Sequence, residues 1–206
     1  MRGKASALGF ALLAIGLAQE PDPIARFGAT VLIPDGLRGQ IYFLRFDTPQ
    51  LPNLRQMISV GTVYATSLNV PTQNFNRGFP GVTDRFEWFA IDYTGRFWAQ
   101  YAGIYRFNLL SDDGSRLWID GKLVVDNDGL HGPREYYGDI DLASGPHRLE
   151  LAYFQGPRES VALVLKVAKP GEDWRIFHVD EFKPPPGVEI PPGLPPVDPG
   201  KKRGKK

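Results

Sequence analysis

The chain has no cysteine, and its 206 residues include only three histidines and two methionines. Without cysteine there can be no disulfide bond, no thiolate zinc site and no lipid attached through a cysteine. His131 has no second histidine at the spacing of a metal site, so we expect its ring to be hydrogen-bonded within the fold. The cellular compartment stays open, because exported proteins also lack cysteine.

The motifs of several enzyme classes are also missing. There is no G-x-S-x-G nucleophile turn, no G-x-G-x-x-G loop and no phosphate-binding G-x-x-x-x-G-K-[ST] loop. Nothing in the sequence distinguishes one pair of its 23 carboxylates as the acid and base of a glycosidase. We therefore predict a protein without catalytic activity.

Helical periodicity is absent between residues 28 and 182, where short apolar runs are divided by Gly, Pro, Asn and Asp. This pattern predicts an all-β antiparallel sandwich or barrel. Residues 69–81 read as a long polar loop. The strands are expected at residues 31–33, 41–46, 56–66, 85–93, 96–99, 104–110, 117–119, 123–125, 138–142, 147–154 and 160–167, with an edge pairing at 175–179.

The net charge of +1 hides a division of charge along the chain. Five of the last six residues are basic, whereas residues 20–182 contain 16 basic and 21 acidic residues, a balance of −5. A mildly acidic domain is a poor partner for a phosphate backbone, so nucleic acid is not an expected ligand.

Both ends of the chain differ in composition from the middle. Residues 1–18 have the basic start, the apolar run and the small-residue cleavage site of a secretory signal peptide. The apolar run of about eleven residues is too short for a membrane span, which needs ~20. After a spacer at 19–29, we expect a domain at 30–182 and a Pro-rich basic tail at 183–206. The mature protein is therefore expected to be secreted, periplasmic or at the cell surface, with no membrane span.

The most informative stretch is IYRFNLLSDDGSRLWIDGKLVVDND, residues 104–128. Apolar residues alternate in a period of two up to Leu109, which predicts a strand with one buried face. Asp120-Gly121 between two short apolar runs predicts a tight hairpin. Asp112 and Asp113 lie in Ser-Asp-Asp-Gly-Ser, which fits either a type I turn or a cation site.

The run from Gly103 to Gly121 resembles the core motif of the PA-fourteen (PA14) domain family, a β-sandwich module named after anthrax protective antigen. The family also occurs in yeast flocculins, epithelial adhesins and bacterial surface proteins. Flanking segments at 89–97, 129–131, 140–142 and 145–154 are similar to those that surround the motif in the family. The resemblance covers about residues 30–170 and implies an antiparallel β-sandwich.

The resemblance also implies a ligand site. In the lectin branch of the family, two successive aspartates joined by a cis peptide bind Ca²⁺, which in turn binds sugar hydroxyls; Asp112 and Asp113 match this pair. A second loop supplies an amide side chain and backbone carbonyls, and Gln155 is the matching side chain. Residues beside the ion are expected to select among sugars, and these are Asn127, Asp128, His131, Arg158 and Glu159.

The sequence therefore favours an exported, Ca²⁺-dependent carbohydrate-binding module whose partners are extracellular or cell-surface glycans. The alternative is an assembly module that keeps the fold and binds a protein partner or a second copy of itself. Trp118 is expected in the core. A sugar-stacking role is left open for Trp88, Trp98 and Trp174.

The signal sequence generates a first prediction. Protein purified from its native host should begin near Gln19, because cleavage is expected after the small-residue site at residues 16–18. Amino-terminal sequencing measures this directly. An intact Met1 on cytoplasmic protein would refute export.

Overall fold

The computed structural model describes residues 36–75, 78–82, 85, 87–157 and 159–188. The predicted signal peptide, the spacer, the first strand at 31–33 and the tail beyond residue 188 lie outside these residues. Within the part of the chain that is described, no helix combines the length and the apolar character needed to cross a membrane.

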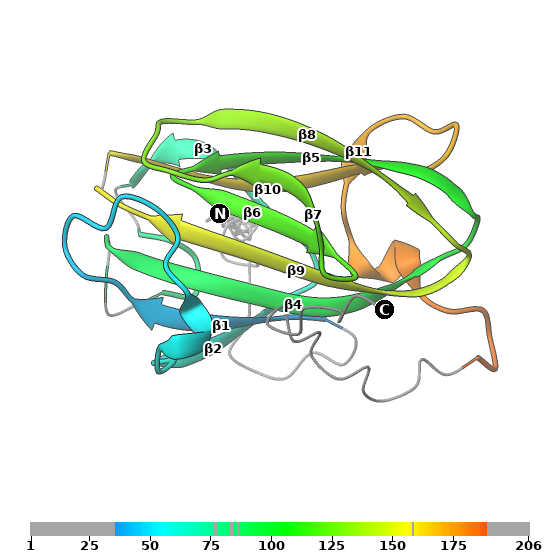
Figure 1. Cartoon of the computed structure of the whole chain (residues 1–206), viewed down its shortest axis with the longest axis horizontal. Helices are drawn as coiled ribbons and strands as arrows, with labels where there is room; N and C mark the ends of the chain where they lie inside the picture. Colours follow the sequence, from blue (N-terminus) through cyan, green and yellow to red (C-terminus); the bar gives the residue numbers. More distant parts are fainter. Residues whose placement is uncertain (1–35, 76–77, 83–84, 86, 158, 189–206) are drawn as a thin grey trace, which may run out of the picture.

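Two antiparallel sheets face each other and form a sandwich, with β4 and β9 in one layer and β5, β8 and β10 in the other (Figure 1). The six-stranded sheet has the order β2 (Gly61–Ala65), β1 (Leu37–Phe43), β4 (Phe89–Ala99), β9 (Gly145–Gln155), β6 (Ser115–Ile119) and β7 (Lys122–Asn127). The second sheet has the order β11 (Arg175–Ile176), β10 (Ser160–Ala168), β5 (Gly103–Asp112) and β8 (Arg134–Leu142), with β3 (Asn69–Asn74) also paired to β10. Two short 3₁₀ helices, η2 (Leu54–Gln56) and η4 (Val179–Phe182), complete the described elements.

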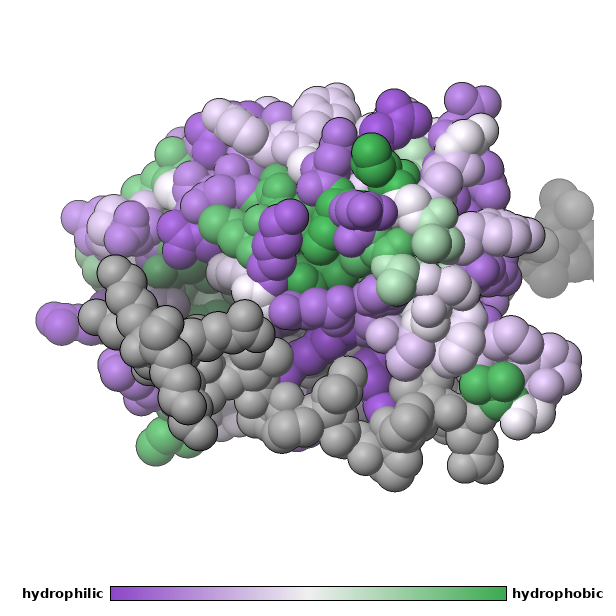
Figure 2. All heavy atoms as spheres, turned by 45° about the vertical axis from the view of Figure 1, so that its right-hand side comes forward, coloured by the Kyte–Doolittle hydropathy of each residue, from purple (hydrophilic) through white to green (hydrophobic). Residues whose placement is uncertain are grey.

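Alternating side chains explain why the sheets pack face to face. On β9 the inward residues Leu149, Leu151 and Tyr153 are fully buried. They meet inward residues of the second sheet such as Leu163 and Leu165 in one continuous core. Burial of this apolar surface is the main force that holds the sheets together. Polar side chains cover most of the face seen in Figure 2, where apolar side chains gather near the middle.

The Asp-Gly hairpin is confirmed. β6 and β7 pair through the turn Asp120-Gly121, and both turn residues have positive φ, 51° and 78°. A two-residue turn of this kind matches the right-handed twist of the strands it joins. The Asp112–Asp113 segment is a different kind of connection, because β5 and β6 belong to different sheets.

Two strand predictions were wrong. Residues 89–99 form one long strand, β4, although separate strands were expected at 85–93 and 96–99 with Thr94-Gly95 between them. Gly95 is required there because a Cβ would lie 2.5 Å from the Leu37 side chain on β1. Residues 69–74, expected as part of a loop, form β3.

The prediction that Trp118 belongs to the core was wrong. Trp118 lies on the outer face of its sheet, partly buried against a small second apolar cluster, because its neighbours Leu117 and Ile119 take the inward positions. Trp88 is buried and Trp174 is 38% exposed.

Besides the β3–β4 connection, three connections cross between the sheets at one end of the sandwich. They join β5 to β6, β7 to β8 and β9 to β10. Strand register brings them together: Asp112 at the end of β5 pairs with Ala162 near the start of β10, and Ser115 at the start of β6 pairs with both Asn127 and Tyr153. The predicted site residues therefore share one end of the fold.

The sandwich is narrow along the side where β7 and β8 lie against each other. A Cβ placed on Gly138 of β8 would lie 1.9 Å from the backbone oxygen of Val124 on β7. Glycine is therefore required for the two strands to approach this closely.

Because the strands approach so closely, adding one methyl group at position 138 should destabilise the domain. Gly138→Ala should lower the free energy of unfolding by about 1–3 kcal/mol, because backbone atoms must move to relieve the overlap. Urea denaturation measures the change. Gly132→Ala is the matched control, since a Cβ there meets nothing within 4 Å. Equal stability of the two variants would contradict the proposed role of Gly138.

Candidate functional site

Two adjacent aspartates occupy the β5–β6 connection. Asp112 is the last residue of β5, and the Asp112–Asp113 peptide bond is cis, as the family resemblance implied. Their exposed fractions are only 4% and 5%. Carboxylates this deeply buried are normally paired with a cation or a set of hydrogen-bond donors.

Donors from the neighbouring connections bind both carboxylates. The Asp113 carboxylate accepts a hydrogen bond from the backbone N–H of His131 at 3.1 Å and from that of Gly156 at 2.8 Å. The hydroxyl of Ser160, the first residue of β10, donates to Asp112 Oδ2. The pair is therefore bound to the β7–β8 connection, to the β9–β10 connection and to the start of β10.

Burial makes both carboxylates harder to ionise. Burial, and to a smaller extent the charge of Asp113, raise the pKa of Asp112 to about 6, against the opposing effect of the hydrogen bond from the Ser160 hydroxyl. Burial also raises the pKa of Asp113, opposed by the backbone N–H groups of Gly156 and His131. Ionisation of both residues therefore places two negative charges in a poorly hydrated site.

The amide of Gln155 lies at the centre of an oxygen cluster. Its Nε2, with two hydrogens to donate, lies within hydrogen-bond distance of three acceptors: Asp113 Oδ2 at 3.3 Å, the Pro157 carbonyl at 3.1 Å and the Ser160 carbonyl at 3.2 Å. Gln155 is fully buried. Three acceptor oxygens thus face one position at the tip of this side chain.

The other end of the amide meets a buried tyrosine. The Tyr153 hydroxyl lies 2.6 Å from Gln155 Oε1 and 2.8 Å from the backbone oxygen of Asp112. A hydroxyl group has one hydrogen, so it can donate to only one of these two acceptors. In this orientation of the Gln155 amide, one of the two short contacts of the Tyr153 oxygen, to Gln155 Oε1 or to the Asp112 carbonyl, therefore has no hydrogen between its oxygens.

Asn127, predicted to contact the ligand, is placed inside the fold. Its amide group donates to the Ser111 hydroxyl and to the Arg134 carbonyl, and its oxygen accepts from Arg134 Nε at 2.8 Å. The side chain is fully buried. Through these hydrogen bonds Asn127 holds the β7–β8 connection in place from inside the fold.

Asp128 ties two connections together. Its Oδ1 accepts hydrogen bonds from the backbone N–H groups of Leu51 at 2.9 Å and Gly129 at 2.8 Å, and Arg116 Nη2 lies 3.1 Å from Oδ2. Leu51 belongs to the connection between β1 and β2, which projects at the left of Figure 1. Asp128 therefore fixes the position of that connection beside the site.

His131 and Glu159 are nearer the surface. Both ring nitrogens of His131 lie within hydrogen-bond distance of backbone carbonyls, those of Asn127 at 2.9 Å and Gly132 at 2.7 Å. The prediction of a hydrogen-bonded His131 is therefore confirmed. Glu159 is exposed, and Arg158 lies outside the described residues.

The donor set fits a hard divalent cation. It consists of carboxylate, amide and carbonyl oxygens, the ligands that Ca²⁺ prefers. Within the described residues, neither Asp112 nor Asp113 has a Lys or Arg partner at ion-pair distance. No cluster of three or more Asp, Glu, His or Cys able to hold a metal occurs there either, so a cation at this point would also depend on amide and carbonyl oxygens.

Comparison with known proteins identifies the family. The family model described as the PA14 domain matches residues 35–175, more than half of the chain. The chain belongs to the PA14 domain family. The matched range covers β1 to the start of β11, so this PA14 domain contains all three inter-sheet connections of the site.

Relatives of this PA14 domain are found in different protein contexts. The anti-sigma-I factor RsgI3 of Acetivibrio thermocellus is 27% identical over 97 residues, which are 47% of this chain and 15% of the relative. The chain thus matches only a small part of that protein.

Two solved structures share the fold at low identity. An anti-sigma factor domain-containing protein from Clostridium clariflavum has a TM-score of 0.58 and 23% identity, covering 78% of this chain and 50% of the other. A PA14 sugar-binding domain from an RTX adhesin has a TM-score of 0.57 and 21% identity, covering 71% and 96%.

Some residues of the site were not expected from the sequence. Ser160 and Tyr153 both contact the Asp112–Asp113 pair or its backbone. Tyr153 occupies an inward position of an alternating strand, which predicts only a core residue. Strand register, which sequence alone does not provide, is what places these hydroxyl groups beside the aspartates.

The Gln155 amide predicts a large stability effect. Gln155→Leu keeps the size of the side chain but leaves buried acceptors of Asp113, Pro157 and Ser160 without this donor. We expect the free energy of unfolding to fall by about 2–4 kcal/mol, since each unsatisfied buried group costs about 1–3 kcal/mol. Urea denaturation in the presence of chelator measures it. Exposed Gln100→Leu should change stability by less than about 0.5 kcal/mol; a similarly small loss for Gln155→Leu would refute its central position.

Proposed function

We propose that this PA14 domain is a non-catalytic, Ca²⁺-dependent carbohydrate-binding module of an exported protein. The observation that carries the proposal is the buried Asp112–Asp113 pair, which has no basic partner among the described residues and lies where three connections meet. A bound cation would compensate the two charges that burial makes unfavourable.

Gln155 is the side chain that would complete the cation site. Turning its amide by 180° exchanges Oε1 and Nε2 without changing the shape of the side chain. The NH₂ group then donates to the Tyr153 hydroxyl, whose single hydrogen is left for the Asp112 carbonyl. Oε1 then faces the oxygens of Asp113, Pro157 and Ser160, four oxygens that require a cation between them.

The chain's own residues would have separate tasks in sugar binding. Asp112, Asp113 and Gln155 hold the ion, and a Ca²⁺ ion so held supplies open coordination positions for vicinal sugar hydroxyls. The β7–β8 and β9–β10 connections border the site with Leu130, which is 43% exposed, and Glu159. These exposed side chains, with His131, are the ones available to select among sugars.

The comparisons support this proposal at the level of the fold. The RTX adhesin domain, described as a PA14 sugar-binding domain, places its binding function on the same architecture. Shallow sugar sites have affinities near millimolar, about 4 kcal/mol, and several linked copies are needed for firm attachment. We therefore expect glycans on a cell surface or in the extracellular space as partners.

A protein-assembly role is the second candidate. The matches to anti-sigma factor proteins favour it, because these place a related domain within regulatory proteins. The second sheet also presents exposed aromatic side chains: Tyr137 is 61% exposed and stacks edge-on against Trp174, over which Arg106 lies. Aromatic and arginine side chains are enriched at protein interfaces.

Calcium dependence is the property that separates the two candidates. Added Ca²⁺ should raise the thermal midpoint of the parent protein, with a stabilisation of about 2.7 kcal/mol when Ca²⁺ is at a hundred times its dissociation constant. Asp113→Asn should abolish this shift, because it removes a negatively charged ligand. Differential scanning calorimetry with Ca²⁺ and with EDTA measures both.

Exposed Asp139→Asn is the matched control and should keep the full calcium response. A glycan array probed with Ca²⁺ and with EDTA then tests sugar binding itself. If millimolar Ca²⁺ does not shift the thermal midpoint of the parent protein, the calcium-dependent carbohydrate mechanism is refuted and the assembly role is left.

A further inference from the structure

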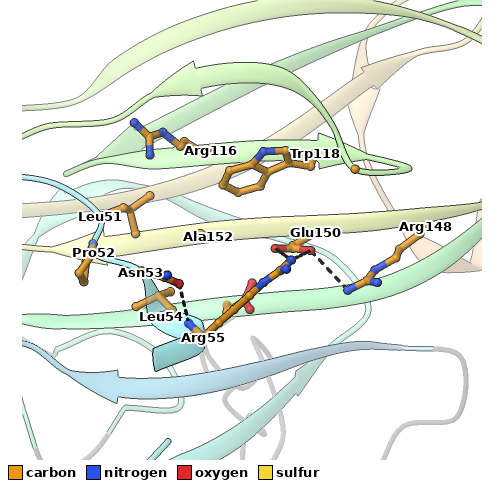
Figure 3. A pocket seen from close by; sticks show the side chains of 12 residues that line it. Leu51, Pro52, Asn53, Leu54, Arg55, Arg116, Trp118, Arg148, Glu150 and Ala152 are labelled. Carbon is orange, nitrogen blue, oxygen red and sulfur yellow. Dashed lines mark hydrogen bonds and ion pairs between the residues drawn. The ribbon is translucent and has the colours of Figure 1, made fainter. Parts of the chain in front are cut away.

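A hollow lies on the outer face of the six-stranded sheet, away from the aspartate pair. It has a volume of about 420 Å³ and lies between the sheet and the β1–β2 connection (Figure 3). Small-molecule sites in proteins are concavities of about 300–1,000 Å³. The hollow is therefore large enough for a small ligand.

Strand register produces the floor of this pocket. Ala152 on β9 pairs with Arg116 on β6 and with Asp92 on β4, and Trp118 pairs with Glu150 in the neighbouring row. Adjacent rows on one face of a sheet lie within side-chain reach of each other. The small Ala152 side chain thus leaves a depression with an indole and two carboxylates at its rim.

The β1–β2 connection forms the opposite wall. Leu51 and Leu54 supply apolar surface, and Arg55 reaches across to Glu150, with Nη2 3.3 Å from each carboxylate oxygen (Figure 3). The hydrogen bond from the Leu51 N–H to Asp128 anchors this wall to the rest of the domain. The pocket is therefore preformed.

Asp92 is the feature that the fold alone does not explain. Its Oδ1 is buried and has no hydrogen-bond partner within the described part of the chain. Burial, and secondarily the charge of Glu150, raise its pKa to about 7, against the opposing effect of Arg55 and Arg148. Asp92 is also one of the residues that line the pocket. Buried polar atoms in folded proteins almost always have a partner, so a carboxylate with an unpartnered oxygen at a cavity has hydrogen-bonding capacity left for a ligand.

Donors lie beside this acceptor. Arg148 binds Glu150 through Nη2 at 3.3 Å, which leaves its Nη1 and Nε for other acceptors. Trp118 packs on the second apolar cluster and adds a flat aromatic surface. A carboxylate acceptor, guanidinium donors and an indole face therefore line the same small volume.

The charge of the lining argues against an ionic ligand. Three arginines, at positions 55, 116 and 148, outnumber the two carboxylates, which disfavours a cation. An anion would be repelled by the nearby carboxylates of Asp92 and Glu150. A neutral sugar avoids both conflicts, because its hydroxyls donate and accept hydrogen bonds while its C–H face packs against an aromatic ring.

We propose that this pocket is a second carbohydrate site, independent of calcium, which binds one neutral sugar residue against Trp118 with a hydroxyl donated to Asp92. It extends the proposed function but does not rest on the cation site. Each domain would then bind a glycan at two places, which raises the overall affinity by avidity.

The test uses the full chain in EDTA, so that a calcium-dependent site cannot bind sugar. The probes are the methyl glycosides of glucose, galactose, mannose and xylose, together with cellobiose, at millimolar concentrations. The indole N–H signal of Trp118, assigned by its absence from Trp118→Phe, should shift in ¹H–¹⁵N spectra with at least one probe. The indole signal of Trp174, which precedes β11 and packs against Tyr137 of the other sheet, should stay in place.

Three variants locate the binding. Ala152→Leu fills the floor and should abolish the response to the probe. Asp92→Leu should weaken binding by about tenfold or more, as expected for loss of a charged hydrogen-bond acceptor. Exposed Asp139→Asn, which lies away from the pocket, should leave the response in EDTA unchanged.

Stability measurements show whether each variant is folded. Above the pKa of about 7, the ionised Asp92 carboxylate disfavours the folded state, so Asp92→Leu should unfold at the same temperature as the parent or higher. No response of Trp118 to any probe would overturn the proposal. A response that survives Ala152→Leu would also overturn it. Loss of calcium-dependent binding alone would count against the site at Asp112 and Asp113 and not against this pocket.

Discussion

One buried carboxylate joins the parts of this domain on which its function depends. Asp113 lies in the β5–β6 connection and accepts hydrogen bonds from the backbone of the β7–β8 connection, at His131, and from that of the β9–β10 connection, at Gly156. All three connections cross between the two sheets. The sheets are held together by apolar packing, which has no directional preference, and these directed bonds set how the crossing segments lie relative to one another. These bonds hold the segments that carry His131 and Gly156 next to the aspartate pair.

The same arrangement has an electrostatic cost that shapes the site. Burial of Asp112 and Asp113 raises the pKa of both, although backbone N–H groups and a hydroxyl group partly compensate. Hydrogen bonds from neutral donors stabilise a carboxylate but do not remove its charge. The fold therefore keeps an unbalanced negative potential at one end, surrounded by amide and carbonyl oxygens. A protein built only for stability would have placed a turn with exposed polar residues there.

The pattern of apolar residues predicted an all-β sandwich or barrel and the Asp120–Gly121 hairpin, because each depends on neighbours along the chain. The sandwich itself and the cis Asp112–Asp113 bond were implied by the resemblance to the PA14 family. Prediction from the sequence failed where distant contacts decide the outcome. Thr94-Gly95 has the composition of a turn, yet Gly95 allows Leu37 to pack closely within a continuous strand. The polar residues of β3 have no strand alternation of their own, and they pair because the edge of β10 is available. The pocket lined by Asp92 and Trp118 was invisible for the same reason, since only strand register brings its rows together.

Asp128 has a consequence that follows from its two sets of partners. Its carboxylate holds Leu51 of the β1–β2 connection, while its backbone continues directly into the β7–β8 connection that binds Asp113. One residue thus fixes both a wall of the pocket and the start of the segment whose backbone binds the aspartate pair. A change at position 128 therefore acts on both places at once, although they lie on different parts of the fold.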